Sequence, residues 1–168
     1  MTSTIEAEDA AAMIETERLK NIERRRRMWS MSKVSGEAHA GISGLVARYA
    51  DYCDHGRWAE AASLFTEDGV FDASDIFGEV VSGTAGLTEF MSTRPKAVAH
   101  HPTTFYIDAL DGDEYSVRLK MLVLFDGALS SIDYSWVVVP VDGDFRIKHQ
   151  RIAMVGRVKT RSASQSVA

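Results

Sequence analysis

One aspartate and one histidine in the middle of this sequence carry the side chains that proton-transfer chemistry needs. Asp54 ends a stretch with helical apolar spacing, and His100 begins a later, strand-like stretch. A neutral imidazole can take a proton and return it, and a carboxylate within hydrogen-bond reach orients the ring and fixes its tautomer. In an apolar pocket, such a pair can remove a proton from carbon and return one to a leaving oxygen. We therefore predict that Asp54 and His100 form a general acid–base dyad.

A tyrosine and several other side chains are candidates for holding a substrate beside that dyad. Tyr49 shares a helical face with Cys53 and could hydrogen-bond a substrate oxygen, whereas Cys53 reads as an inert small hydrophobe. An aromatic residue on such a face packs in the core by default, so each substrate-binding role competes with a structural one. The candidate substrate-binding residues are His101, Trp58, Met121, Tyr134, Trp136 and Asp133.

The sequence predicts neither a metal site nor a cofactor. His100 and His101 are neighbours, and neighbouring residues of a strand point to opposite faces, so the two imidazoles cannot easily share one ion. A single cysteine excludes a disulfide framework within the chain and a multi-cysteine zinc or iron–sulfur site. The chain has no G-x-x-x-x-G-K-[ST], G-x-G-x-x-G or G-x-S-x-G motif.

Helices are expected to position Tyr49 and Asp54. Apolar residues recur at helical spacing from Ile42 to Cys53, and Gly56 is a stop signal. We expect a second short helix with one apolar side, and then a turn at Asp68–Gly69 into a strand at 70–72. A third helix is expected near residue 84, capped by the hydroxyl residues around Gly83. The apolar side of the second helix is expected to comprise Trp58, Ala61, Ala62 and Phe65.

Four long strands are expected to follow and to carry His100. Asp-Gly pairs at 111–112, 126–127 and 142–143 delimit segments 100–110, 113–125, 128–141 and 144–156. Asp-Gly between apolar runs is a strong hairpin signal, so these segments predict an antiparallel meander. Apolar and polar residues alternate from Tyr115 to Phe125, which indicates one buried face. With helices first and the sheet after, the fold class is α+β.

Length and composition limit the other possibilities. The 168 residues, with 45% hydrophobic and 26% charged residues, are typical of one soluble domain. The formal charge of −5 gives no general attraction to nucleic acid or anionic lipid. There is no membrane-length apolar run and no secretory signal, so we expect no membrane partner and a cytoplasmic location. The expected divisions are an N-terminal helical extension (1–36), a main domain (37–158) and a disordered tail (159–168).

The order of elements and several motifs resemble the SnoaL-like family of the nuclear transport factor 2 (NTF2-like) superfamily. The resemblance covers about Ile42 to Arg157, and it implies a cone-shaped α+β barrel in which helices pack on a curved antiparallel sheet around one deep pocket. It also implies a homodimer or homotrimer. The matching stretches are RYADYCD (48–54), WAEAASLFTEDGVF (58–71), residues 78–90, His100-His101, Asp111-Gly112-Asp113 and DGDFRI (142–147).

Within that superfamily, this chain is most similar to lyases of the scytalone dehydratase and bile-acid 7α-dehydratase type, which use an Asp–His dyad. The resemblance places the dyad on Asp54 and His100 and a pocket tyrosine on Tyr49. Cys53 stands where the scytalone enzyme has a tyrosine, which counts against a scytalone-type substrate. A basic residue of the last strand has no clear match, with Gln150 and Arg151 near its place. The implied function is cofactor-independent, dehydratase-like elimination on a hydrophobic oxygenated small molecule.

Two other functions stay open at this point. A ketosteroid-isomerase-like isomerase or polyketide cyclase would use Tyr49 and Asp133 as an oxyanion hole. Its base position falls on Ser74, so Asp75 or Asp72 would have to act instead. The third possibility is a protein that binds a small molecule without turning it over. The histidine and the helix-end aspartate favour the lyase.

Overall fold

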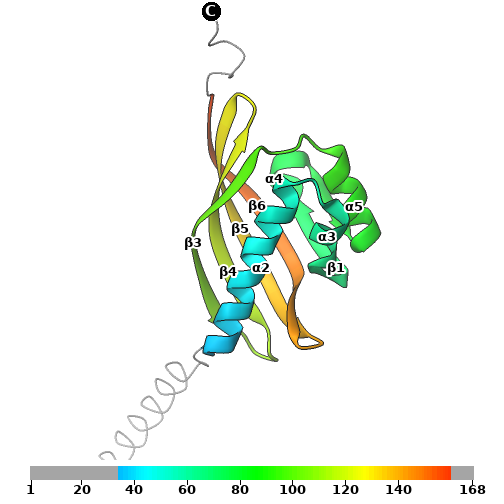
Figure 1. Ribbon diagram of the computed structural model, residues 1–168, viewed down its shortest axis with the longest axis vertical. Coiled ribbons are helices and arrows are strands. Elements are labelled where there is room, and N and C mark those ends of the chain that lie inside the picture. Colours follow the sequence, from blue (N-terminus) through cyan, green and yellow to red (C-terminus); the bar gives the residue numbers. More distant parts are fainter. Residues whose placement is uncertain (1–33, 160–168) are drawn as a thin grey trace, which may run out of the picture. The chain divides into compact units, whose positions relative to one another are not determined.

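The computed structural model describes residues 34–159. The expected N-terminal extension and C-terminal tail therefore lie almost wholly outside the described residues. Four helices and six strands follow one another within this range (Figure 1). They are α2 (Gly36–Asp54), α3 (Trp58–Ser63), β1 (Phe65–Ala73), α4 (Ser74–Phe77), β2 (Glu79–Ser82), α5 (Thr84–Thr93), β3 (Ala99–Ala109), β4 (Tyr115–Phe125), β5 (Ala128–Val141) and β6 (Asp144–Lys159).

Helix α2 forms where the apolar spacing predicts it. Ser35 caps its start, because the Ser35 hydroxyl accepts a hydrogen bond of 3.0 Å from the backbone N–H of Ala38. The helix ends at Asp54, and Gly56 follows with a φ of 69°, a conformation that favours glycine. The residues on the buried face are Ala38, Ile42, Leu45, Val46, Tyr49, Ala50 and Cys53.

The six strands form one sheet in the order β2-β1-β6-β5-β4-β3. The meander from β3 to β6 is antiparallel throughout, as the three Asp-Gly turns predict. At the last turn, both Asp142 and Gly143 have positive φ, 52° and 80°. This is the geometry that a two-residue hairpin turn requires. The predicted strand limits are within three residues of those observed.

The α+β class, with helices packed on a curved sheet, is confirmed. Figure 1 shows α2 lying across one face of the sheet, with α3, α4 and α5 gathered beside β1. The sheet is mixed rather than wholly antiparallel, because β1 runs parallel to β6. Inward side chains of β4, β5 and β6 meet α2 in one apolar core, in which Trp136 and Met121 are buried. Within residues 34–159, no helix combines the length and apolar character needed to cross a membrane.

Three local expectations were wrong. Asp68–Gly69 is not a turn, because β1 continues from Phe65 through an irregularity in its pairing with β6. Phe65 therefore lies on β1 instead of α3. Helix α5 has Gly83 as its N-cap and receives no side-chain cap, so neither neighbouring hydroxyl residue caps it. Short α4 and β2 have no apolar period of their own, and the sequence did not predict them.

The irregularity in β1 explains why a glycine stands at position 69. A Cβ there would lie 2.8 Å from the Phe65 Cβ and 3.1 Å from the Ile147 carbonyl oxygen. We expect Gly69→Ala to lower the free energy of unfolding by about 1–3 kcal/mol, the usual cost of overpacking. Gly86→Ala is the control, because nothing lies within 4 Å of its added Cβ and the position is helical. Gly86→Ala should raise the free energy of unfolding by about 0.5–1 kcal/mol. Urea unfolding measures both variants.

Candidate active site

A cavity of about 190 Å³ opens between the helices and the inner face of the sheet. All four described helices and strands β1 and β3 to β6 contribute side chains to its wall. The wall is mainly apolar and aromatic. An apolar cavity of roughly 150 Å³ can hold a benzene molecule, so this cavity, which is open on one side, has room for at least one organic ring. The main apolar contributors are Trp58, Phe71, Phe90, Val123, Ile132 and Tyr134.

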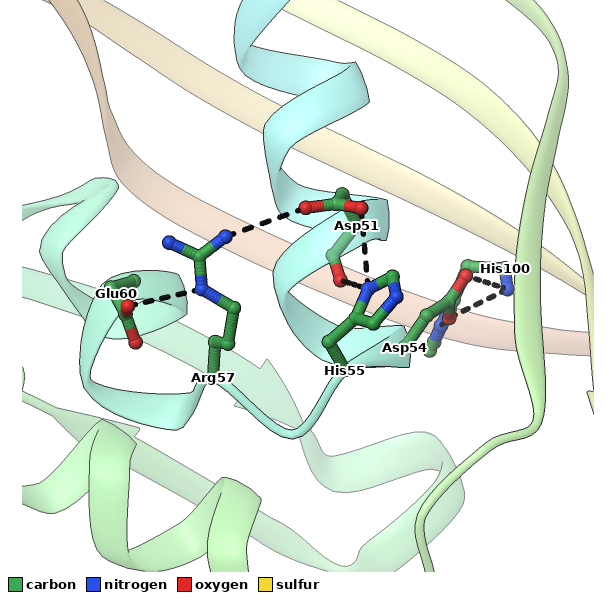
Figure 2. A network of polar contacts seen from close by, with 6 residues as sticks. All are labelled: Asp51, Asp54, His55, Arg57, Glu60 and His100. Carbon is green, nitrogen blue, oxygen red and sulfur yellow. Dashed lines mark hydrogen bonds and ion pairs between the residues drawn. The ribbon is translucent and has the colours of Figure 1, made fainter.

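The structure brings Asp54 and His100 into direct contact, as Figure 2 shows. The Asp54 Oδ1 lies 2.6 Å from the His100 Nδ1, and it also accepts a 2.8 Å hydrogen bond from the His100 backbone N–H. The side chains of His100 and Asp54 are only 12% and 21% exposed. His100 is part of the cavity wall. The contact favours the tautomer protonated on Nδ1, which leaves Nε2 to accept a proton.

A separate polar network fixes the end of α2 around this dyad. Asp51 pairs with His55 and Arg57, and Arg57 also pairs with Glu60 of α3 (Figure 2). The imidazole of His55 is 67% exposed, and its Nδ1 donates to the Asp51 carbonyl oxygen at 2.8 Å. Residues 51, 55, 57 and 60 therefore hold the α2–α3 corner in place but contribute nothing to the cavity wall.

Tyr49 lies on the cavity wall, one helical turn before Cys53. Its hydroxyl oxygen accepts a 2.8 Å hydrogen bond from the Nε2 of Gln150 on β6. Burial is the main cause that raises the pKa of Tyr49 well above its usual value, and the nearby Cys53 and Tyr134 raise it further. Tyr49 is therefore a hydrogen-bond donor at neutral pH and not a base. Its oxygen accepts from Gln150, and a side-chain hydrogen bond between Tyr49 and Cys53 also affects the pKa values of both groups.

The other sequence-predicted binding residues fall into three groups. Trp58 and Tyr134 line the cavity. Met121 and Trp136 are buried beneath it, and the Trp136 ring meets Tyr49 edge-on with centroids 5.3 Å apart. His101 and Asp133 are not in the cavity wall, because the strand alternation that turns His100 inward turns these two outward.

The residues of the isomerase alternative do not converge. Asp133 forms an ion pair with Lys120 at 2.8 Å on the outer face, so it cannot join Tyr49 in an oxyanion hole. Asp75 accepts a 2.8 Å hydrogen bond from the backbone N–H of Met154. Hydrogen bonds from Ser74 are the main cause that lowers the pKa of Asp72, which makes Asp72 a weaker base. Neither aspartate lines the cavity.

Four polar residues of the site did not figure in the sequence analysis in their observed roles. Gln150 was noted only as the near match of a basic residue, but it is the partner of Tyr49. Arg94, Lys96 and Arg157 line the cavity, whereas Arg151 lies outside its wall with its Nε 3.7 Å from the Asp72 carboxylate. A pairing irregularity in β6 between Ser131 and Ile132 of β5 hides the inward direction of Arg157 from simple alternation. Within residues 34–159, no group of three or more His, Cys, Asp and Glu residues could hold a metal ion.

Comparison with known proteins agrees with this architecture. The sequence model of the SnoaL-like domain family matches residues 35–151. A Mycobacterium tuberculosis protein of unknown function is 28% identical with a TM-score of 0.60, over 77% of this chain and 80% of that one. No protein of curated function matches the sequence.

Two further solved structures share the fold at lower identity. The hexachlorocyclohexane dehydrochlorinase LinA-type3 of Novosphingobium barchaimii is 16% identical with a TM-score of 0.66, over 73% of this chain and 90% of that one. An NTF2-like protein of Novosphingobium aromaticivorans with a cystatin-like fold is 18% identical with a TM-score of 0.61, over 87% and 93% of the two chains. At such identities, the likeness shows the fold alone.

The buried Cys53 gives a test of the cavity wall that needs no substrate. Burial is the main cause that raises the pKa of its thiol from 9.0 to about 12. Because of this shift, the native thiolate fraction at pH 8 should be roughly a thousandth of that in the unfolded chain. Only the thiolate is nucleophilic, so the rate of alkylation follows this fraction. We expect alkylation by iodoacetamide to be at least ~100-fold slower in the native protein than in 8 M urea, measured by mass spectrometry.

The raised pKa of Cys53 also makes the free energy of unfolding depend on pH. The unfolded chain releases the thiol proton at lower pH than the folded one, so the neutral thiol stabilises the fold fully below pH 9. That contribution is lost progressively between pH 9 and about 12. A Cys53→Ala variant should lack this part of the pH dependence in urea unfolding. Rapid alkylation of the folded protein at pH 8 would contradict the buried placement.

Proposed function

The chain belongs to the SnoaL-like domain family, and from that premise we propose that it is a cofactor-independent lyase. It eliminates a leaving group from a hydrophobic, oxygenated small molecule, as a dehydratase does. The observation that carries this proposal is the 2.6 Å contact between Asp54 and His100 at the wall of an apolar cavity. A histidine held in this way is a proton acceptor in a place from which bulk water is largely excluded.

The proposed reaction moves one proton twice. The Nε2 of His100 takes a proton from a substrate carbon, and the electrons of that C–H bond form a double bond to the neighbouring carbon. The bond from that neighbour to its oxygen breaks, and the imidazolium returns the proton to the leaving oxygen, which departs as water. Asp54 keeps the ring oriented and stabilises its charge while it carries the proton. The Tyr49 hydroxyl, kept protonated by burial, donates a hydrogen bond to a substrate oxygen.

The isomerase alternative has less support, because Tyr49 of α2 faces the cavity on the inner side of the sheet, whereas Asp133 lies on the outer side. A non-catalytic binding protein would have the same cavity, and in it the bonds from the His100 backbone to Asp54 would serve only to hold α2 on the sheet. The fold shared with a dehydrochlorinase is compatible with elimination and does not decide which bond is broken. The experiments below separate a base from a passive pocket.

A generic elimination substrate tests the base without knowledge of the natural one. 5-Nitrobenzisoxazole opens to a coloured phenolate when a base removes its ring proton. We expect the protein to catalyse this reaction and His100→Asn to lower kcat/KM by about 10²–10⁴-fold, the usual range for general-base catalysis. His101→Asn is the control, because its imidazole lies outside the cavity wall. Equal kcat/KM values for His100→Asn and His101→Asn, or no catalysis by the native protein, would contradict the lyase proposal.

The role of Asp54 is to position and charge-stabilise the imidazole, and this predicts a graded effect. Asp54→Asn keeps an acceptor for the Nδ1 proton but removes the negative charge. With 5-nitrobenzisoxazole, kcat should fall by about 10-fold or more while KM changes little, because the lost charge stabilises the imidazolium rather than the bound substrate. Asp51→Asn, on the exposed side of the same helix end, should leave kcat unchanged. A KM effect alone in Asp54→Asn would show that Asp54 only shapes the cavity.

A further inference from the structure

The charges on the cavity wall all have one sign. Among the described residues that line the cavity, Arg94, Lys96 and Arg157 are cationic, and none has a carboxylate side chain. A charge beside an apolar wall is less screened than one in bulk water, so its attraction to an opposite charge is stronger. The cavity therefore favours an anionic group somewhere along its length.

Two of these cations have no acidic partner among residues 34–159. The Nη2 of Arg94 pairs with Glu79, and its guanidinium lies 4.8 Å from the centroid of the Phe90 ring. By contrast, no carboxylate of residues 34–159 lies within 4.0 Å of the Lys96 amine or the Arg157 guanidinium. Arg157 instead lies over the ring of Phe125, which is itself part of the cavity wall, at 5.7 Å from the centroid. Within the part of the chain that the structure describes, no carboxylate therefore competes with a bound anion for these two cations.

The buried part of Arg94 adds a second, independent sign of a missing polar group. Its Nε is buried and has no hydrogen-bond partner, although buried polar atoms are nearly always paired. Arg94 lies in the same link between α5 and β3 as Lys96, and both reach the cavity wall. An acceptor oxygen of a bound molecule would satisfy this donor.

The strand register relates the cations to the base. His100 of β3 pairs with Val123 of β4, which pairs with Ser130 of β5, which in turn pairs with Arg157 of β6. These residues form one row across the inner face of the sheet, with His100 at one end and Arg157 at the other. Neighbouring strands are about 4.8 Å apart, so the row spans about 14 Å between its terminal backbones. A molecule of two linked rings lying along this row would reach from one end to the other.

We propose that the substrate of this site is an elongated, ring-containing carboxylate. Its carboxylate binds Arg157 and Lys96, and its reacting carbon lies beside His100. A guanidinium matches the two oxygens of a carboxylate and holds them in a fixed direction, which would set the register of the substrate against the base. The assignment of the reacting end rests on the proposed function, whereas the preference for an anion does not.

A matched pair of ligands tests this preference. Biphenyl-4-carboxylate and biphenyl-4-carboxamide have nearly the same shape and differ in charge. By isothermal titration calorimetry, we expect the carboxylate to bind at least ~10-fold more tightly, since one charge-assisted hydrogen bond has about this effect. Arg157→Gln and Lys96→Gln should each reduce that ratio several-fold, and the double variant should abolish it. Arg118→Gln removes a cation that is not in the cavity wall and should leave the ratio unchanged.

The outcome can be separated from that of the proposed function. His100→Asn should keep the preference for the carboxylate, because it removes the base and leaves the cations. A preference that persists when 5-nitrobenzisoxazole is not turned over would make the protein a binder of anionic ring compounds. Equal affinity for the two ligands, or a preference that survives the double variant, would overturn this inference even if His100-dependent elimination is observed.

Discussion

The site depends on one carboxylate, that of Asp54, which bonds to both the backbone N–H and the ring of His100. Asp54 accepts hydrogen bonds from the His100 N–H through both oxygens, at 2.8 and 3.1 Å, and contacts the ring through one of them. The backbone bonds join the last turn of α2 to the start of β3. The contact that orients the proposed base is therefore also a contact that holds the helix on the sheet.

The cavity exists because the other elements leave this junction open on one side. Strands β4, β5 and β6 place large side chains under α2, whereas α3, α4 and α5 close the space beside β1 and β6. Apolar walls surround the histidine, and the outer face of the sheet carries an exposed ion pair between Lys120 of β4 and Asp133 of β5. The inner face of the sheet thus borders the cavity, whereas the outer face is in contact with solvent. The cytoplasmic location expected from the sequence and the homo-oligomer implied by the resemblance stay predictions.

How far the sequence predicts the structure depends on whether a feature is local. The helical spacing around Tyr49 and the Asp-Gly turns predict α2 and the meander, because each is encoded by residues close together in the chain. Pairing between β1 and β6 joins segments that are far apart in the sequence, so no local pattern predicts it. The same holds for Gln150 beside Tyr49 and for Arg157 in the row of His100, since both depend on irregular pairing along β6. Asp133 shows the converse, because alternation with the buried Ile132 and Tyr134 turns it outward, a local signal that the aligned position overrode.

The number of residues in the short link between α5 and β3 affects both the cations of the cavity wall and the direction of the His100 side chain. Residues 94–98 supply Arg94 and Lys96 to the cavity wall, and the Val98 N–H then donates to the Leu124 carbonyl oxygen at 2.7 Å, just before His100. Side chains alternate along a strand, so one residue gained or lost after this bond would rotate the imidazole to the opposite surface. Insertions and deletions at this point are thus constrained to even numbers of residues.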